Sequence, residues 1–262
     1  MHLGVPMEFA AALALMLLSQ QPVTDGTWLA PVYSNEVTRP LDPPLHEQHY
    51  YADLALKLLI DDPLPAQYIL IVDRNKNVQA IFTYWISPAR QAHFIGASPV
   101  STGKPGRFDY FTTPTGVFAH TLDNPDFRAE GTPNENGIRG YGSKGMRVFD
   151  FGWQTAERGW GRGGTSLLRL QLHATDPDLL ESRLGTPQSK GCIRIPATLN
   201  MFLDHYGILD AEYDRALHEG RSLWILSNTR QPTAWSGRYL VVVDSDRTTR
   251  PAWALPTKAP IK

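Results

Sequence analysis

The frequency of glycine and proline constrains the fold of this chain more than any other feature of its sequence. Its 262 residues include 21 glycines and 21 prolines, about 16% together against an average near 12%. Both residue types favour turns, so we expect many short segments joined by turns rather than a few long elements. The sequence alone therefore predicts a β-rich, mixed fold.

Short apolar or alternating segments lie between these turns and predict the strands. A polar segment at residues 73–77 separates two of them and predicts a hairpin. The strands are expected at residues 68–72, 78–86, 92–100, 116–120, 147–151, 168–173, 222–226 and 238–244.

Three segments have the features of helices. Residues 46–60 carry Tyr51, Leu54, Ala55 and Leu58 at the spacing of one helix face, and Asp61-Asp62-Pro63 follows. A second helix is expected to start at Pro196 and to end near Gly207, and a third to span 211–218. Residues 21–45 are rich in Pro, Thr and Asp and are expected to form a linker or an ordered wrap.

The chain as a whole has the composition of an ordinary globular protein, with a net charge of −1. Such a charge gives no indication of a nucleic-acid partner. The apolar run at residues 9–18 is too short to span a bilayer and suits a signal peptide. We therefore expect residues 1–22 to be a signal peptide or hydrophobic N-terminal segment, with a short buried helix as the alternative.

Cys192 is the only cysteine of the chain, so it cannot form an internal disulfide. If its segment is extended, Lys190 and Arg194 point to the same side as the thiol. A cation about 6 Å from the sulfur would stabilise the thiolate by roughly 2–3 kcal/mol at an effective dielectric near 20. The sequence thus predicts a thiol pKa lowered by about two units from about 8.5, as in a nucleophile.

His173 is the candidate base for this thiol. It follows the alternating run that predicts a strand from Leu168, and residues 174–177 then break that strand. A histidine at the exit of a strand into a loop is well placed for catalysis. A Cys–His pair is the minimum for acyl transfer by a thiol, whereas the structural alternatives are a buried cysteine and a histidine that ends a strand.

The segment from His173 through residues 184–194 resembles the signature of the L,D-transpeptidase (YkuD-type) catalytic domain. That family has a histidine, a spacer, and then Ser/Thr-His-Gly-Cys followed by an apolar residue and often arginine. Residues 99–106 and the Thr-Pro-Thr-Gly turn at 113–116 are similar to the upstream part of the same domain. The resemblance implies a mainly β, sandwich-like fold with a few peripheral α-helices.

The resemblance also implies a division of the chain. Residues 23–66 would form an N-terminal linker and helix, and residues 67–228 the L,D-transpeptidase-like catalytic domain. Residues 229–262 would form a C-terminal strand and tail. The chain contains no convincing internal repeat.

The resemblance assigns roles to several residues of the signature. Cys192 matches the nucleophile, His173 the general base, and the carbonyl of Ala174 the group that orients the imidazole. Lys190 stands where the family usually has histidine, and we expect Lys190→Ala to lower the rate and raise the thiol pKa.

The remaining residues of the signature are expected to shape the site. Backbone N–H groups around Gly191 and Cys192 would stabilise an oxyanion, and Ser189 is expected to be a turn or hydrogen-bonding residue rather than a second nucleophile. Arg194 is expected to bind a substrate carboxylate or to form a structural salt bridge.

The function implied is that of an exported transferase of the cell wall. It would form a thioester at Cys192 with a peptidoglycan tetrapeptide stem and pass the acyl group to an amine of another stem, a lipoprotein or a D-amino acid. The alternatives are an L,D-carboxypeptidase, in which water is the acceptor, and a catalytically silent peptidoglycan-binding protein. The implied location is the periplasm or the cell exterior.

No cofactor and no metal are expected. His205 and His218 lie on separate predicted helices, without a cysteine or third histidine at ligand spacing. The long polar segment at residues 123–141 is expected to be either a substrate-facing loop or a simple surface excursion.

Overall fold

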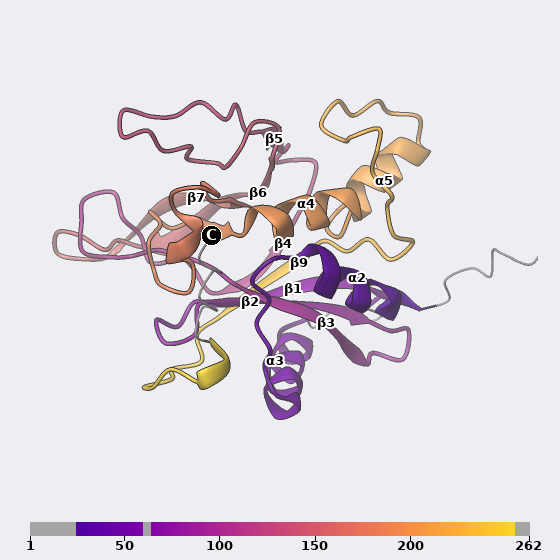
Figure 1. The fold of residues 1–262 in the computed structure, drawn as a ribbon, viewed down its shortest axis with the longest axis horizontal. Helices are drawn as coiled ribbons and strands as arrows, with labels where there is room; N and C mark the ends of the chain where they lie inside the picture. The colour runs from indigo at the N-terminus through magenta and orange to yellow at the C-terminus, as the bar shows by residue number, and fades with distance from the viewer. Residues whose placement is uncertain (1–24, 60–63, 255–262) are drawn as a thin grey trace, which may run out of the picture.

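The computed structural model describes residues 25–59 and 64–254, and it places their strands in two sheets (Figure 1). The five-stranded sheet has the order β3-β2-β1-β9-β4, and the four-stranded sheet the order β5-β6-β7-β8. The strands are β1 (Gln67–Asp73), β2 (Ala80–Ile86), β3 (Ala92–Pro99), β4 (Gly116–Ala119), β5 (Phe127–Arg128), β6 (Arg147–Glu157), β7 (Thr165–Ala174), β8 (Ile193–Ile195) and β9 (Tyr239–Val243).

The main hydrophobic core lies between the two sheets. Leu70 of β1 and Leu240 of β9 pack there with Phe149 of β6, Leu172 of β7 and Ile193 of β8. Because side chains alternate along a strand, the residues between these core positions point to the opposite faces of the two sheets. On β7 and β8, the opposite face is where the candidate catalytic residues lie.

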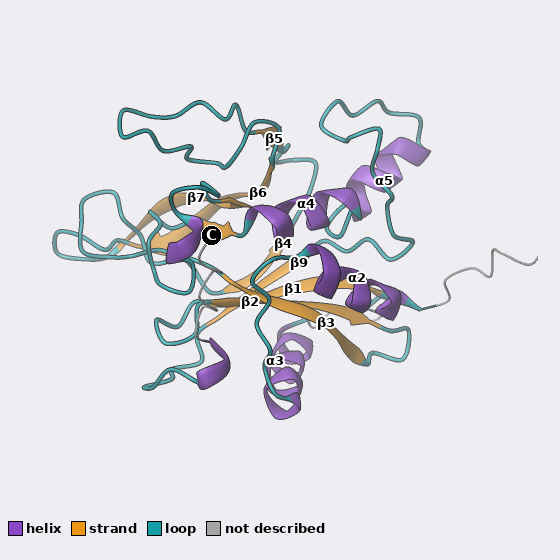
Figure 2. Ribbon diagram, viewed as in Figure 1, coloured by secondary structure: helices purple, strands orange, loops and turns teal. Residues whose placement is uncertain are grey.

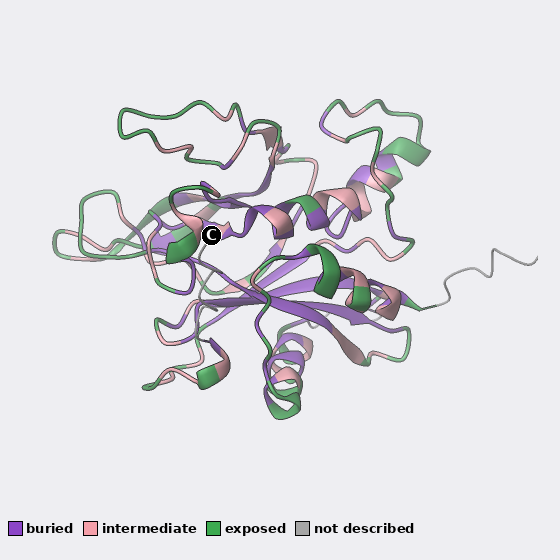
Figure 3. Cartoon of the chain, in the orientation of Figure 1, coloured by how far each residue is buried: buried purple, intermediate pink, exposed green. Residues whose placement is uncertain are grey.

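The five-stranded sheet is covered on both faces. Every residue of β1 and β2 is buried, and Figure 3 shows this sheet as the most continuously buried part of the molecule. Helix α3 (Leu45–Leu58) packs Tyr51 and Ala55 against the face turned away from the four-stranded sheet. Burial of both faces explains why β1 is an uninterrupted apolar run rather than an alternating one.

The other α-helices lie at the sides of the two sheets (Figure 2). They are α2 (Leu29–Glu36), α4 (Ala197–His205) and α5 (Ala211–His218), and short 3-10 turns, η1 (Gly26–Trp28), η2 (Glu181–Arg183) and η3 (Ala252–Ala254), complete the helical elements described. This arrangement confirms the predicted sandwich-like, mainly β fold with peripheral helices.

A buried cluster of charges fixes the start of β6. Arg147 is fully buried, and its guanidinium donates to Asp126 at 2.6 Å and to Asp210 at 3.0 Å. Asp126 also accepts a hydrogen bond from His120 at 2.8 Å if the Nε2 atom carries the proton. Removing one partner of such a network leaves an uncompensated buried charge, which typically costs 3–5 kcal/mol.

Two local predictions were wrong, and a third had left two outcomes open. Residues 222–226 form turns rather than a strand, and the carbonyl of Ile225 accepts a hydrogen bond from Arg128. The segment expected to be a linker or an ordered wrap is ordered over its described part and contains α2, whose Pro31 lies in the first turn, where a missing N–H group costs nothing. Leu58 is 43% exposed because α3 ends there.

Strand β9 lies between β1 and β4, so the segment after residue 228 contributes an inner strand to the five-stranded sheet. The proposed boundary at residues 228 and 229 stays a prediction. The expected signal peptide lies outside the described residues. Within residues 25–59 and 64–254, no helix is long and apolar enough to cross a membrane.

Candidate active site

The loop that carries Cys192 is held by backbone hydrogen bonds from two upstream segments. The N–H groups of Ser189 and Phe111 donate to the carbonyls of Thr102 and Lys190, each at 3.0 Å, and Lys104 N–H donates to Ser189 O at 3.0 Å. The segment of residues 99–116, which contains both stretches that resemble the family upstream of the signature, thus acts as the frame of the cysteine loop.

Thr113, the first residue of the Thr-Pro-Thr-Gly turn, connects this frame to the residue before the cysteine. Its hydroxyl donates to the carbonyl of Gly191 at 2.7 Å and accepts from the N–H group of Gly103 at 2.8 Å. Thr113 is buried, and its hydroxyl joins the frame to the cysteine loop through these two bonds. The sequence alone gives no signal for this role of Thr113.

Gly191 has a backbone conformation and close packing that favour glycine at this position. Its φ is +137°, and a Cβ atom there would lie 2.7 Å from a methyl group of Leu168. Its N–H group donates to the Ser189 hydroxyl at 3.0 Å, and that hydroxyl donates to the carbonyl of Cys192 at 2.5 Å. Ser189 therefore closes the loop, and the Gly191 N–H group is hydrogen-bonded to the Ser189 hydroxyl in this structure.

The pairing of β7 with β8 sets the relative positions of the cysteine and the histidine. The two strands are parallel, with Leu172 opposite Ile193 and His173 opposite Arg194. Leu172 and Ile193 point into the core, so His173 and Arg194 point to the other face. Cys192 immediately precedes β8, and its thiol interacts electrostatically with Arg194. Parallel pairing thus places His173 near the end of β7 and Cys192 just before the neighbouring strand β8.

His173 is buried, and its Nδ1 atom lies 2.7 Å from the carbonyl oxygen of Ala174. A carbonyl only accepts hydrogen bonds, so Nδ1 carries the proton and Nε2 keeps its lone pair in the neutral ring. Burial lowers the pKa of His173 to about 4, and the charge of Arg194 acts in the same direction. At neutral pH the imidazole is therefore uncharged and able to accept a proton.

Cys192 is half-buried, and its Sγ atom lies 3.7 Å from the carbonyl of Arg169. Burial raises the pKa of the thiol, and this effect exceeds the opposing influence of the Gln171 N–H group and of Arg194. The expected lowering of the thiol pKa was therefore wrong. The resting pair is a neutral thiol and a neutral imidazole, so the thiol proton must leave as the sulfur attacks.

Lys190 does not share the side of the thiol. The positive φ of Gly191 turns the chain between them, so the alternation of an extended segment does not apply. Its ammonium group lies 2.9 Å from the carboxylate of Asp109, and its side chain is 59% exposed. The predicted contribution of Lys190 to the thiol pKa is thus replaced by a surface ion pair.

A layer of polar side chains, not predicted from the sequence, supports the pair. The buried carboxylate of Asp150 accepts from Gln171 at 3.0 Å and from Arg169 at 2.8 Å. The amide oxygen of Gln171 accepts from the hydroxyl of Tyr141 at 3.2 Å. The ring of Tyr141 meets the ring of His173 edge-on, with 4.7 Å between centroids, so Asp150 is coupled to the imidazole through two side chains.

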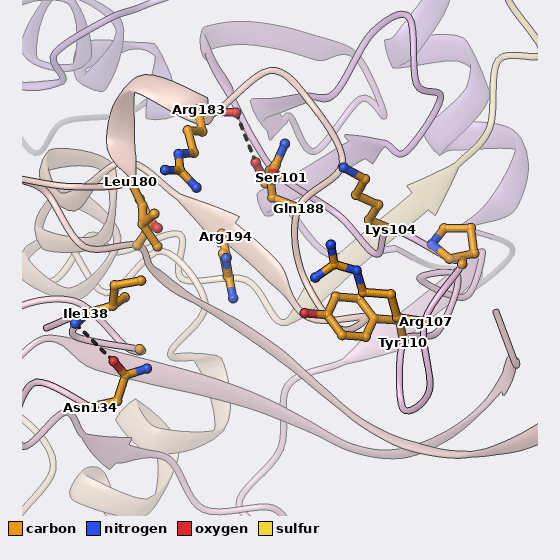
Figure 4. A pocket seen from close by; sticks show the side chains of 14 residues that line it. Ser101, Lys104, Arg107, Tyr110, Asn134, Ile138, Leu180, Arg183, Gln188 and Arg194 are labelled. Carbon is orange, nitrogen blue, oxygen red and sulfur yellow. Dashed lines mark hydrogen bonds between the residues drawn. The ribbon is translucent and has the colours of Figure 1, made fainter. Parts of the chain in front are cut away.

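Arg194 faces a cleft of about 630 Å³ (Figure 4). Asn134, Ile138 and Gly140 line part of it, so the polar segment at 123–141 faces the cleft as well as solvent. The cleft is also lined by Ser101, Lys104, Pro105, Gly106, Arg107, Tyr110, Thr175, Leu180, Arg183 and Gln188.

The family is decided by a comparison with family models. The model described as the L,D-transpeptidase catalytic domain (YkuD) matches residues 57–206, which is more than half of the chain. The chain belongs to the L,D-transpeptidase family. The resemblance identified in the sequence is thereby confirmed, and the matched range contains the frame, the cysteine loop and His173 of this L,D-transpeptidase domain.

Other comparisons add little to this assignment. A search of curated proteins found no match. One similar solved structure is a fused Zn-dependent amidase/peptidase/peptidoglycan-binding domain-containing protein from Clostridium acetobutylicum. It is 12% identical, the alignment covers 88% of this chain and 74% of that one, and the TM-score is 0.31. This similarity is too low to support an argument about the site.

The L,D-transpeptidase domain brings together Cys192, His173, Ala174 and Arg194, whereas Gly191 and Ser189 shape the loop and Lys190 lies apart. Among the described residues, no cluster of His, Cys, Asp and Glu side chains could hold a metal ion. The chemistry that this arrangement can support is proton transfer and attack by a thiol.

Proposed function

We propose that this protein is an L,D-transpeptidase that forms a thioester at Cys192 with a peptidoglycan tetrapeptide stem. The observation that carries the proposal is the hydrogen bond from His173 Nδ1 to Ala174 O, since it leaves Nε2 as the basic atom beside the cysteine loop. The substrate class comes from the family, whose enzymes act on peptidoglycan peptides. A location in the cell envelope follows from that substrate and belongs to the same proposal.

In the proposed acylation, His173 Nε2 takes the thiol proton while the sulfur of Cys192 attacks the carbonyl before the terminal D-residue. A C–S bond forms, and the oxyanion is stabilised by backbone N–H groups at the cysteine loop. Collapse of this intermediate breaks the C–N bond. His173 gives its proton to the leaving amine, and the thioester remains on Cys192.

In the second half of the reaction, an acceptor amine attacks the thioester. His173 removes a proton from the amine, a new amide bond forms, and the thiol regains its proton. Water in place of the amine would give a free carboxylate and a tripeptide, which is the carboxypeptidase outcome. The low pKa of His173 suits this sequence because the imidazole starts neutral in both halves.

The experiment is mass spectrometry of tetrapeptide muropeptides after incubation with the protein, with Cys192→Ala in parallel. Crosslinked dimers that are absent with the variant would support transpeptidation, and tripeptides alone would support carboxypeptidation. Identical products with both proteins would contradict a role for Cys192. Unchanged substrate together with tight binding would favour the silent peptidoglycan-binding protein.

A further inference from the structure

The cleft that Arg194 faces is lined by four cationic side chains and by no acidic one. The cations are Lys104, Arg107, Arg183 and Arg194. None of the four forms an ion pair with another residue of the described ranges. By contrast, Arg128, Arg139, Arg147 and Arg169 each bind a carboxylate of the chain. The cleft therefore concentrates positive charge that the described part of the fold does not neutralise.

These side chains come from three segments that meet around the same space (Figure 4). Lys104 and Arg107 belong to the frame before β4, Arg183 ends η2, and Arg194 lies in β8. Figure 4 shows Arg194 between Arg183 and the side that carries Lys104 and Arg107. Several cations around one space repel each other, and an anionic ligand removes this repulsion.

Arg194 lacks a partner for part of its guanidinium. Its Nε atom is buried and makes no hydrogen bond, and such an N–H group costs free energy until it meets an acceptor. Arg194 is also two residues from Cys192 and interacts electrostatically with its thiol, so an anion bound at Arg194 would be within reach of a peptide held at the nucleophile. Carboxylates suit guanidinium groups because they accept two parallel N–H donors.

We propose that this cleft binds free carboxylates of the acyl-donor peptide and selects donors that carry them over donors in which they are amidated. The proposal rests on the proposed function and names the donor class for the same site. Neutralising a carboxylate by amidation removes its attraction to the four cations and leaves the size of the peptide almost unchanged. Selectivity at this cleft is therefore a matter of charge rather than of shape.

The test measures binding rather than turnover. Cys192→Ala protein is titrated calorimetrically with a synthetic tetrapeptide whose carboxylates are free and with the same peptide amidated. We expect the acidic peptide to bind at least tenfold more tightly at low salt, and we expect this advantage to shrink as the salt concentration rises. Equal dissociation constants for the two peptides would overturn the proposal.

Two double variants locate the effect in the cleft. Lys104→Gln with Arg183→Gln removes two exposed cations from different segments of the cleft, and it should abolish most of the preference for the acidic peptide. The matched control is Lys57→Gln with Arg215→Gln, which removes exposed cations on α3 and α5. The proposal would also be overturned if the Lys104→Gln, Arg183→Gln protein kept the full preference for the acidic peptide. Loss of that preference in the Lys57→Gln, Arg215→Gln control would overturn it as well.

The same peptides separate this proposal from the proposed function. If wild-type protein is acylated equally well by both peptides and Cys192→Ala binds them equally, the cleft proposal is wrong and the enzyme assignment stands. If the acidic peptide binds selectively but neither peptide acylates Cys192, the cleft proposal stands and the enzyme assignment is wrong.

Discussion

The ammonium group of Lys190 lies 2.9 Å from the carboxylate of Asp109 and 5.8 Å from the centre of the Tyr110 ring. Both partners belong to the frame segment that holds the cysteine loop. Lys190 thus ties two surface segments together instead of acting on the thiol. An exposed pair of this kind typically contributes about 0.2–1 kcal/mol.

Lys190→Ala should leave the thiol pKa nearly unchanged. The charge that it removes is already balanced by Asp109 and is directed to solvent. The measurement is the rate of alkylation of Cys192 as a function of pH in the wild type and the variant. Curves that superimpose within a few tenths of a pH unit agree with the structure, and a shift of a full unit would restore the electrostatic role expected from the sequence.

Arg194→Gln should raise the thiol pKa, in contrast to Lys190→Ala. Arg194 is the charged side chain that favours the thiolate of Cys192. Without it, less opposes the effect of burial, which raises the thiol pKa. The alkylation curve should therefore move to higher pH, while Lys190→Ala serves as the control for loss of a nearby positive charge. A curve that stays in place would show that the guanidinium does not act on the sulfur.

The buried neutral state of His173 should make stability depend on pH in acid. Its pKa is lowered to about 4 in the folded protein, whereas an unfolded histidine titrates near 6.5. Between these values the unfolded chain binds more protons, so stability falls as pH falls from about 6.5 to about 4. The loss from this group reaches about 3 kcal/mol.

The comparison for this prediction is His173→Gln, followed by urea denaturation between pH 4 and 7. The free energy of unfolding of the variant should change less with pH than that of the wild type over that window. His120, whose pKa is raised by Asp126 against the effect of burial, is present in both proteins and cancels. Parallel curves would mean that the imidazole of His173 is not buried in the neutral form.

Gly191→Ala should destabilise the protein and inactivate it together. The added methyl group would lie 2.7 Å from Leu168 at a φ of +137°, and the combined clash and strain should cost about 1–3 kcal/mol. The matched control is Gly106→Ala, because Gly106 has a comparable φ of +119° but an added Cβ atom would meet no atom within 4 Å. Thermal unfolding should show the larger loss for Gly191→Ala, and equal losses would contradict the close packing around the cysteine loop.

The sequence predicted the elements whose signals are local. The hairpin of β1 and β2, helix α5 and the strand that ends at His173 follow from apolar patterns and turn residues. Helix α2 was missed because Pro31 and scattered polar residues hide a short helix that is stabilised by packing of Leu29 and Tyr33 against the core.

The site was predictable in its chemistry but not in its electrostatics. Cys192 and His173 have a family signature, whereas Asp150, Gln171 and Tyr141 come together only through the pairing of β6 with β7 and the course of a loop. The pKa of a thiol depends on burial, which a six-residue motif does not specify. Lys190 could not be placed because one positive φ at Gly191 reverses the direction that alternation assigns.

The most direct measurement is the intact mass of the protein after brief exposure to a tetrapeptide donor, followed by peptide mapping. We expect the mass of the protein to increase by the mass of the donor minus its terminal D-amino acid, and we expect this adduct to be located on Cys192 and to be removed by hydroxylamine. Cys192→Ala should show no increase, and His173→Gln should acylate at least a hundredfold more slowly, within the range of general-base effects of about 10²–10⁴. An adduct on another residue, or equal acylation of the His173→Gln protein, would contradict the assignment of nucleophile and base.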